Sequence, residues 1–146
     1  MYDTILMPVD GSDVSGHALD EGLRLASELG SKVILMYVVD MTIAAMPEAE
    51  LGVSNTELMR KSFEEQGEKV VRSAGEAAAA KAVRFETVMT EGDVQNEIIA
   101  IAEEKKVSLI VIGTHGRRGL NRLLLGSVAE SVAKHAHCPV LLIRPA

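Results

Sequence analysis

Short apolar runs alternate with long amphipathic segments along the whole chain, and this alternation constrains the fold more than any other feature of the sequence. The second, fourth and fifth runs are almost continuously apolar, as expected for parallel strands that are covered on both faces. Five strands are therefore predicted, over residues 4–9, 32–39, 84–90, 107–112 and 139–144.

The amphipathic segments between these runs carry apolar residues at helical spacing, as Leu19, Leu23 and Ala26 do in the first of them. Helices are predicted over residues 12–29, 55–81, 94–105 and 127–135, and Gly30 is a typical C-terminal stop for the first. The order βαβαβαβαβ predicts a parallel sheet with right-handed crossovers and helices on both faces. With 146 residues, the chain fits a single doubly wound α/β domain.

Two stretches do not fit the alternation. Residues 40–54 form one long connection, in which we allow for a short helical turn. Pro8 lies within the first apolar run, although proline has no N–H to donate to a strand ladder. We therefore expect Pro8 at the carboxyl end of the first strand, where pairing stops.

The composition argues against several classes of partner. There are 15 Lys+Arg against 21 Asp+Glu, which gives a net charge of −6 and disfavours a nucleic-acid polymer. Four aromatic residues offer few platforms for stacking single strands. The single cysteine, Cys138, excludes an internal disulfide. Because no apolar run approaches the length that spans a bilayer and no signal-peptide pattern opens the chain, we expect a cytoplasmic protein that does not contact a membrane.

The first specialised strand-to-helix connection is Asp10-Gly11-Ser12. In open α/β sheets, ligands bind beyond the carboxyl ends of the strands. The Asp10 carboxylate is suited to accept hydrogen bonds from a ribose hydroxyl or an adenine amino group. Capping of the following helix by Asp10 or Ser12 explains the same residues, and both interpretations stay open.

The second specialised connection follows the fourth strand and contains Gly113, Gly116, Gly126 and Ser127. Glycine lets the backbone turn tightly and approach a ligand closely. Gly126-Ser127 opens a helix, where unpaired N–H groups and the helix dipole favour an anion. The Ser127 hydroxyl can donate to a phosphate, or it can form a capping box with Glu130, since Ser-x-x-Glu fits that pattern.

The charge pattern around this second connection favours an anionic ligand. Between residues 105 and 129 none of the 21 acids occurs, although five basic residues do: Lys105, Lys106, Arg117, Arg118 and Arg122. No Gly-x-x-x-x-Gly-Lys-Ser/Thr, no Gly-x-Gly-x-x-Gly after the first strand and no Gly-x-Ser-x-Gly is present. A Walker-type site, a dinucleotide site of the usual kind and a hydrolase nucleophile are therefore disfavoured.

The glycine spacing resembles that of a known family. Gly113-x2-Gly116-x9-Gly126-Ser127 matches the Gly-x2-Gly-x9-Gly-Ser/Thr signature of the ATP-binding branch of the universal stress protein family. The opening Ile-Leu-Met-Pro-Val-Asp-Gly-Ser and the closing His-Cys-Pro-Val-Leu-Leu-Ile-Arg are also similar to that family. The resemblance covers essentially the whole chain and implies one domain over residues 1–146. It also implies a sheet of order 3-2-1-4-5, in which the two specialised connections meet.

The resemblance further implies a binding site for ATP, or for AMP or ADP. Adenosine would be contacted at the end of the first strand and by the backbone of Val38, and the phosphates by the glycine-rich connection. An Mg²⁺ or Mn²⁺ ion would be bound through the phosphates, because no carboxylate cluster suited to a metal is visible. The predicted nucleotide-binding residues are Pro8, Val9, Asp10, Val38, Ile112, Gly113, Thr114, His115, Gly116, Arg117, Gly126, Ser127 and Val128.

No catalytic residue and no metal ligand is assigned. His135, His137 and Cys138 crowd one junction without a distant ligand pair, which disfavours a tetrahedral metal site. For His115, no second group at a recognisable spacing indicates acid–base catalysis, so we interpret it as a loop residue or a ligand contact.

Three functions remain open from the sequence. The first is an adenine-nucleotide-binding signalling module with slow or no ATP hydrolysis, which forms a homodimer through the edge strand around Val140–Ile143, as members of the family commonly do. The second is an ATP-dependent enzyme, an ATPase or a nucleotidyl transferase. The third is an interaction protein of the same fold that uses no nucleotide.

Overall fold

The computed structural model describes residues 1–44, 56–115 and 125–146. Every predicted strand and helix is present, with boundaries that differ from the predicted ones by two residues at most. The strands are β1 (Thr4–Pro8), β2 (Lys32–Asp40), β3 (Phe85–Gly92), β4 (Leu109–Gly113) and β5 (Val140–Ile143). The helices are α1 (Asp13–Leu29), α2 (Met41–Ala44), α4 (Thr56–Ala80), α5 (Val94–Glu104) and α6 (Ser127–His135).

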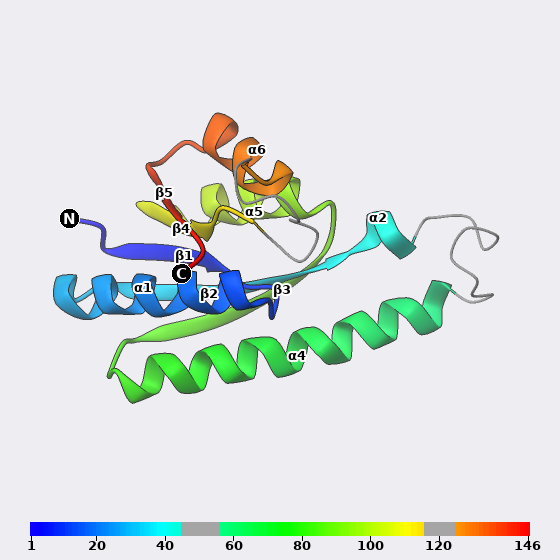
Figure 1. The fold of residues 1–146 in the computed structure, drawn as a ribbon, viewed down its shortest axis with the longest axis horizontal. Coiled ribbons are helices and arrows are strands. Elements are labelled where there is room, and N and C mark those ends of the chain that lie inside the picture. Colours follow the sequence, from blue (N-terminus) through cyan, green and yellow to red (C-terminus); the bar gives the residue numbers. More distant parts are fainter. Residues whose placement is uncertain (45–55, 116–124) are drawn as a thin grey trace.

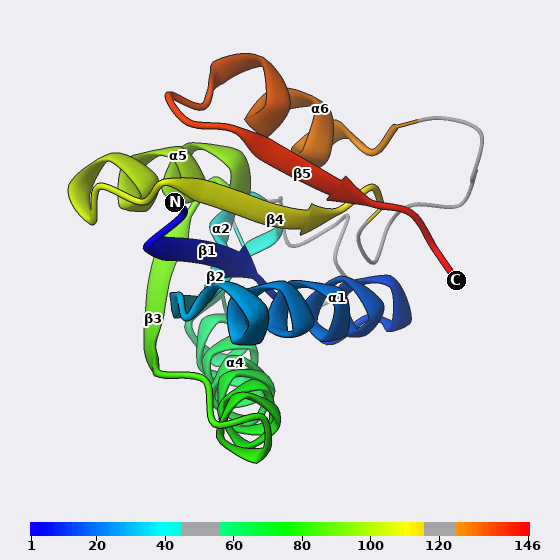
Figure 2. The ribbon, with the colours of Figure 1, turned by 90° about the vertical axis from the view of Figure 1, so that its left-hand side faces the viewer.

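The five strands form one parallel sheet in the order β3-β2-β1-β4-β5. Helices α1 and α4 cover one face of this sheet, and α5 and α6 cover the other (Figures 1 and 2). The doubly wound α/β fold and the strand order 3-2-1-4-5 are therefore confirmed. None of the helices in the described parts of the chain has the length and hydropathy needed to span a membrane.

Each central strand contributes side chains to two cores, one on each face of the sheet. In β1, Ile5 and Met7 belong to the core under α1 and α4, whereas Leu6 belongs to the core under α5 and α6. All three side chains are at most 1% exposed. This two-sided burial is the physical reason why the strand sequences are continuously apolar rather than alternating.

Strand β1 loses its β4 neighbour before it ends. It pairs with β4 at Ile5 and Leu6, but with β2 as far as Pro8, and the Val9 N–H then donates to the Met36 carbonyl at 2.8 Å. Because successive N–H groups of a strand point to opposite sides, the missing N–H of Pro8 falls on the side of β4, where the ladder has stopped. The expected position of Pro8 at the carboxyl end of β1 is confirmed. From Met7 onward, β1 and β4 are no longer paired.

Candidate functional site

A cavity of about 450 Å³ lies where the carboxyl ends of β1, β2 and β4 meet the N-termini of α5 and α6. Its volume is within the range of small-molecule sites, and its position is the topological switch point of the sheet. Ten of the thirteen predicted residues line it: Pro8, Val9, Asp10, Val38, Ile112, Gly113, His115, Gly126, Ser127 and Val128. Thr114 does not line it, and Gly116 and Arg117 are outside the described residues.

The turn between β1 and α1 is built by short polar side chains. Asp10 Oδ1 accepts a hydrogen bond from the Ser12 N–H at 2.8 Å, and Ser12 Oγ accepts one from the Ser15 N–H at 3.2 Å. Ser12 is thus the N-cap of α1, and the capping role left open for it is confirmed. The Asp10 N–H donates to Ser15 Oγ at 3.0 Å. These bonds hold Asp10 in place at the rim of the cavity.

The two ends of the glycine-rich connection meet through their backbones. The Gly126 N–H donates to the Thr114 carbonyl at 2.7 Å, and the Thr114 N–H donates to the Ile143 carbonyl at 3.0 Å. A Cβ on Gly126 would lie 2.7 Å from that Thr114 oxygen and 3.4 Å from the Cα of His115. Glycine is required at position 126 for this close approach and not for its backbone angles, because its φ of −62° is open to any residue.

Helix α6 begins at the cavity wall without a side-chain cap. Gly126 is its N-cap, no side-chain hydrogen bond closes that cap, and Ser127 is the first helical residue. The capping box predicted as an alternative for Ser127 and Glu130 is therefore wrong, because Ser127 is one position too late. Glu130 instead pairs with Lys134 at 2.9 Å. The first N–H groups of α6 have no partner within the helix, and residues 126–129 line the cavity.

Thr114 and His115 form a buried polar pair behind the lining. Thr114 Oγ1 and His115 Nδ1 are 2.9 Å apart, and the residues are 8% and 7% exposed. The backbone of Thr114 joins β4 to both β5 and α6, which accounts for its position away from the cavity. His115 reaches the cavity wall although it is only 7% exposed.

Two acidic residues of the cavity were missed by the sequence analysis. Asp40 ends β2, and Asp93 follows β3 directly as the N-cap of α5, where no side-chain bond closes the cap. Both occupy the strand-end position that made Asp10 a candidate, so the same rule applied to every strand would have found them. The acids of the described lining thus follow β1, β2 and β3. Two helix N-termini without a side-chain cap also line the cavity, that of α5 beginning at Asp93, an acid, and that of α6 beginning at Gly126 in the β4–β5 half of the sheet.

The histidines near the C-terminus make local contacts. His137 pairs with Glu103, and His135 Nδ1 is 2.9 Å from the Ser131 carbonyl oxygen. Burial raises the pKa of the neighbouring Cys138 thiol. Within residues 1–44, 56–115 and 125–146, no three His, Cys, Asp or Glu side chains gather to hold a metal ion.

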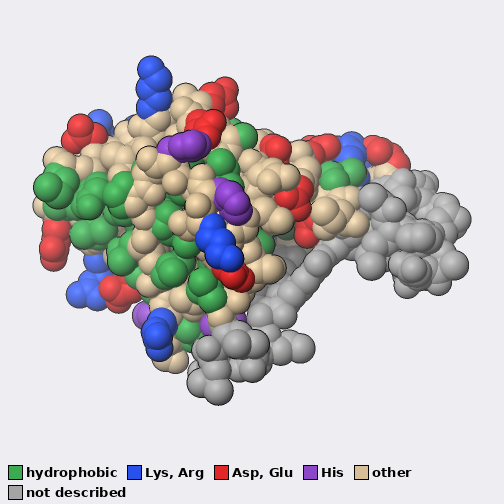
Figure 3. All heavy atoms as spheres, turned by 90° about the horizontal axis from the view of Figure 1, so that it is seen from above, with side chains coloured by type: hydrophobic (Ala, Val, Ile, Leu, Met, Phe, Trp, Pro, Cys, Tyr) green, Lys and Arg blue, Asp and Glu red, His purple; other side chains and the backbone are tan. Residues whose placement is uncertain are grey.

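Basic and acidic side chains are interspersed on the face formed by α5 and α6. On the described part of that face, Lys and Arg side chains are separated by acidic, apolar and uncharged groups and form no continuous basic area (Figure 3).

An open, doubly wound α/β sheet with a ligand-sized cavity at its switch point defines the class of this protein. The family is set by comparison with known proteins. The profile of the Universal stress protein family matches residues 1–144, and the chain belongs to this family. Universal stress protein MJ0531 of Methanocaldococcus jannaschii is 42% identical over 144 residues, which are 99% of this chain and 83% of the relative.

Solved structures of the family have the same fold. Universal stress protein UspA from Lactobacillus plantarum superposes with a TM-score of 0.85 at 26% identity, over 98% of both chains. A universal stress protein in complex with cAMP has a TM-score of 0.74 at 24% identity, over 99% of both chains. An Arabidopsis thaliana family member with AMP bound has a TM-score of 0.72 at 22% identity, over 98% of this chain and 92% of the other.

Proposed function

We propose that this protein is a cytoplasmic member of the ATP-binding branch of its family, and that it binds one adenine nucleotide in the cavity at the switch point. The observation that carries the proposal is the joining of ten predicted residues, from both specialised connections, around one cavity of about 450 Å³. A signalling role follows from binding without rapid turnover, since occupancy of the cavity then reports the nucleotide level.

The two halves of the cavity suit the two halves of a nucleotide. Asp10, Asp40 and Asp93 supply carboxylate acceptors for ribose hydroxyls and for the amino group of a base. The same carboxylates repel phosphates. The N-terminus of α6 supplies unpaired N–H groups and a positive dipole end for the phosphates, and the Ser127 hydroxyl is an additional donor. We therefore orient the nucleoside toward β1 and β2 and the phosphates toward α6.

The cAMP and AMP complexes of two proteins with this fold support an adenine nucleotide as the ligand. Binding of Mg²⁺ or Mn²⁺ is proposed through the phosphates, because the described residues hold no metal-binding group of three side chains. Slow or absent hydrolysis is proposed because the sequence has no Gly-x-x-x-x-Gly-Lys-Ser/Thr motif with its phosphate-binding lysine and no identifiable general base. Timed release of ADP from ATP tests this, and turnover at ordinary enzyme rates would favour the ATP-dependent enzyme instead.

Titration calorimetry with the purified, nucleotide-free chain tests the proposed function. We expect ATP to bind with one site per chain, and adenosine and tripolyphosphate each to bind more weakly because each fills one half of the cavity. The alternative of an interaction protein without a nucleotide predicts no heat with ATP, ADP or AMP, and that result would refute the proposal.

We also propose a homodimer formed through β5. This strand is at the edge of the sheet, and Leu141 on it is 40% exposed, so its outer side offers unpaired backbone groups and apolar surface. A second copy pairing along Val140–Ile143 would cover both. Sedimentation equilibrium is expected to show a dimer, and a monomeric mass at high protein concentration would contradict the assignment.

A further inference from the structure

One wall of the cavity comes from a helix that the glycine signature does not include. Phe63, in the second turn of α4, lines the cavity together with Val38 and Asp40 at the end of β2 and Thr42 in α2. Its side chain is half-buried and packs against the small core formed around Tyr37 and Val39. An aromatic ring thus borders the half of the cavity that contains the acidic residues.

Aromatic rings are scarce in this chain, which has two tyrosines, two phenylalanines and no tryptophan. Tyr37 also lines the cavity, but it is 5% exposed and its ring lies against α4. A Cβ added at Gly67 would come within 2.5 Å of that ring and 2.8 Å of the Met89 methyl group. The Tyr37 ring is therefore fixed in the core, and Phe63 is the aromatic ring suited to contact a ligand.

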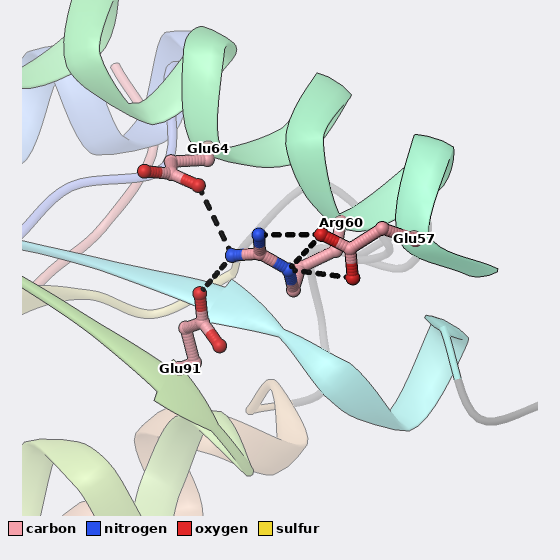
Figure 4. Close-up of polar contacts among 4 residues, drawn as sticks. All are labelled: Glu57, Arg60, Glu64 and Glu91. Carbon is pink, nitrogen blue, oxygen red and sulfur yellow. Dashed lines mark hydrogen bonds and ion pairs between the residues drawn. The ribbon is translucent and has the colours of Figure 1, made fainter.

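The position of Phe63 is fixed from both sides along α4. Four residues later, Gly67 lets the helix lie directly on Tyr37. Three residues earlier, Arg60 pairs with Glu91 near the end of β3 at 2.6 Å (Figure 4). Positions separated by three and four share one face of a helix, so both contacts hold the face that carries Phe63.

Arg60 is tied into a network that keeps it charged and in place. Its guanidinium also pairs with Glu57 at 2.7 Å and Glu64 at 3.1 Å, and the side chain is 29% exposed. The hydrogen bond and the charge of Arg60 lower the pKa of the Glu57 carboxyl. Since Glu91 is two residues before Asp93, the network joins the helix that carries Phe63 to the connection that carries a cavity acid.

We propose that Phe63 stacks against the base of the bound nucleotide and that Arg60, through Glu91, is the residue that positions it. This inference rests on the proposed function and assigns a base contact to α4. A planar base has two apolar faces and polar edges. Phe63 supplies a surface for one face. Asp40 and Thr42, whose N–H and hydroxyl both donate to Asp40 Oδ1, line the same part of the cavity and offer polar groups to an edge.

The test is titration of ATP and of tripolyphosphate, which has no base, into the full-length chain and the variant Phe63→Leu. Loss of the ring is expected to weaken ATP binding roughly tenfold while tripolyphosphate binding is unchanged. Phe63→Tyr, which keeps the ring, is expected to retain the wild-type affinity. Phe85→Leu is the matched control, because Phe85 is 40% exposed on the edge strand β3 and does not line the cavity.

The role of Arg60 is tested by a double-mutant cycle. Arg60→Met is expected to weaken ATP binding several-fold in the wild-type chain but to have no further effect in Phe63→Leu. Arg24→Met removes a comparable ion pair, with Glu21 on α1. It is expected to leave the affinity for ATP unchanged in both the wild-type chain and Phe63→Leu. Independent effects of Arg60→Met and Phe63→Leu would overturn the positioning role.

The outcomes separate this inference from the proposed function. If the wild-type chain binds ATP and Phe63→Leu binds it equally well, the stacking contact is refuted and nucleotide binding stands. If Phe63→Leu weakens ATP and tripolyphosphate alike, the residue acts through the structure of the cavity and the inference also fails. If the wild-type chain binds neither compound, both proposals fall.

Discussion

Replacement of Gly126 by valine is expected to lower the affinity for ATP roughly tenfold to a hundredfold and to reduce stability by about 1–3 kcal/mol. The Cβ alone would be 2.7 Å from the Thr114 carbonyl oxygen, which is backbone and cannot rotate away. The hydrogen bond between these two residues must then lengthen, and the start of α6 moves away from the cavity. Calorimetry and urea unfolding measure the two effects.

The sequence alone predicts that Gly126→Val weakens ATP binding and leaves the fold intact. The structure adds the cost in stability, because the clash is with the chain's own backbone. Gly126→Ala, which adds only the clashing Cβ, is expected to show part of the same losses, and Gly16→Ala is its matched control. A Cβ at Gly16 meets nothing within 4 Å, so that variant is expected to be as stable as wild type or up to about 1 kcal/mol more stable. Wild-type affinity in Gly126→Val would contradict the phosphate assignment.

Replacement of Ser127 by aspartate is expected to abolish most ATP binding, by a factor of about 100 or more, without loss of stability. A carboxylate at the first position of α6 would face the phosphates, and opposed like charges cost several kcal/mol in binding. The same carboxylate interacts favourably with the helix dipole, by about 0.3–1 kcal/mol. Binding and stability are therefore expected to change in opposite directions, as seen by calorimetry and thermal unfolding.

Ser73→Asp is the control for this charge change. Ser73 is exposed on α4 and does not line the cavity, so this variant has the same net charge and is expected to bind ATP as the wild type does. Ser127→Asn separates charge from size and is expected to keep most of the affinity. If Ser127→Asp binds ATP normally, the phosphates do not lie at the N-terminus of α6.

Strands and helices could be predicted from the sequence because their signal is local. The two-sided burial of strands such as β2 makes them continuously apolar, and the predicted helix 127–135 coincides with α6. The order of the strands is not encoded in any single segment, and its prediction depended on the family resemblance. Helix α2 has only four residues and begins where Asp40 Oδ1 accepts a hydrogen bond from the Thr42 N–H. A helix this short has too few residues to show helical spacing, so the sequence indicates only a short turn here.

The site could be predicted in part for the same reason. Asp10 and Gly126 lie at strand or helix ends, which the sequence pattern locates. Phe63 is more than 20 residues beyond β2 along the chain and reaches the cavity through the packing of α4, for which the sequence carries no local sign. The capping box offered as an alternative for Ser127 does not form, because Gly126 and not Ser127 is the N-cap of α6.

The central claim is that a nucleotide occupies the cavity between β1 and α6. Amide chemical shifts of the ¹⁵N-labelled chain, followed during titration with ATP, test it residue by residue. We expect the largest changes at Val9, Asp10, Val38, Gly113 and residues 126–129. The amides of Ala102, Lys106 and Cys138, which line a separate hollow, are expected to stay unchanged. Saturating ATP that shifts the second group and leaves the first unmoved would contradict it.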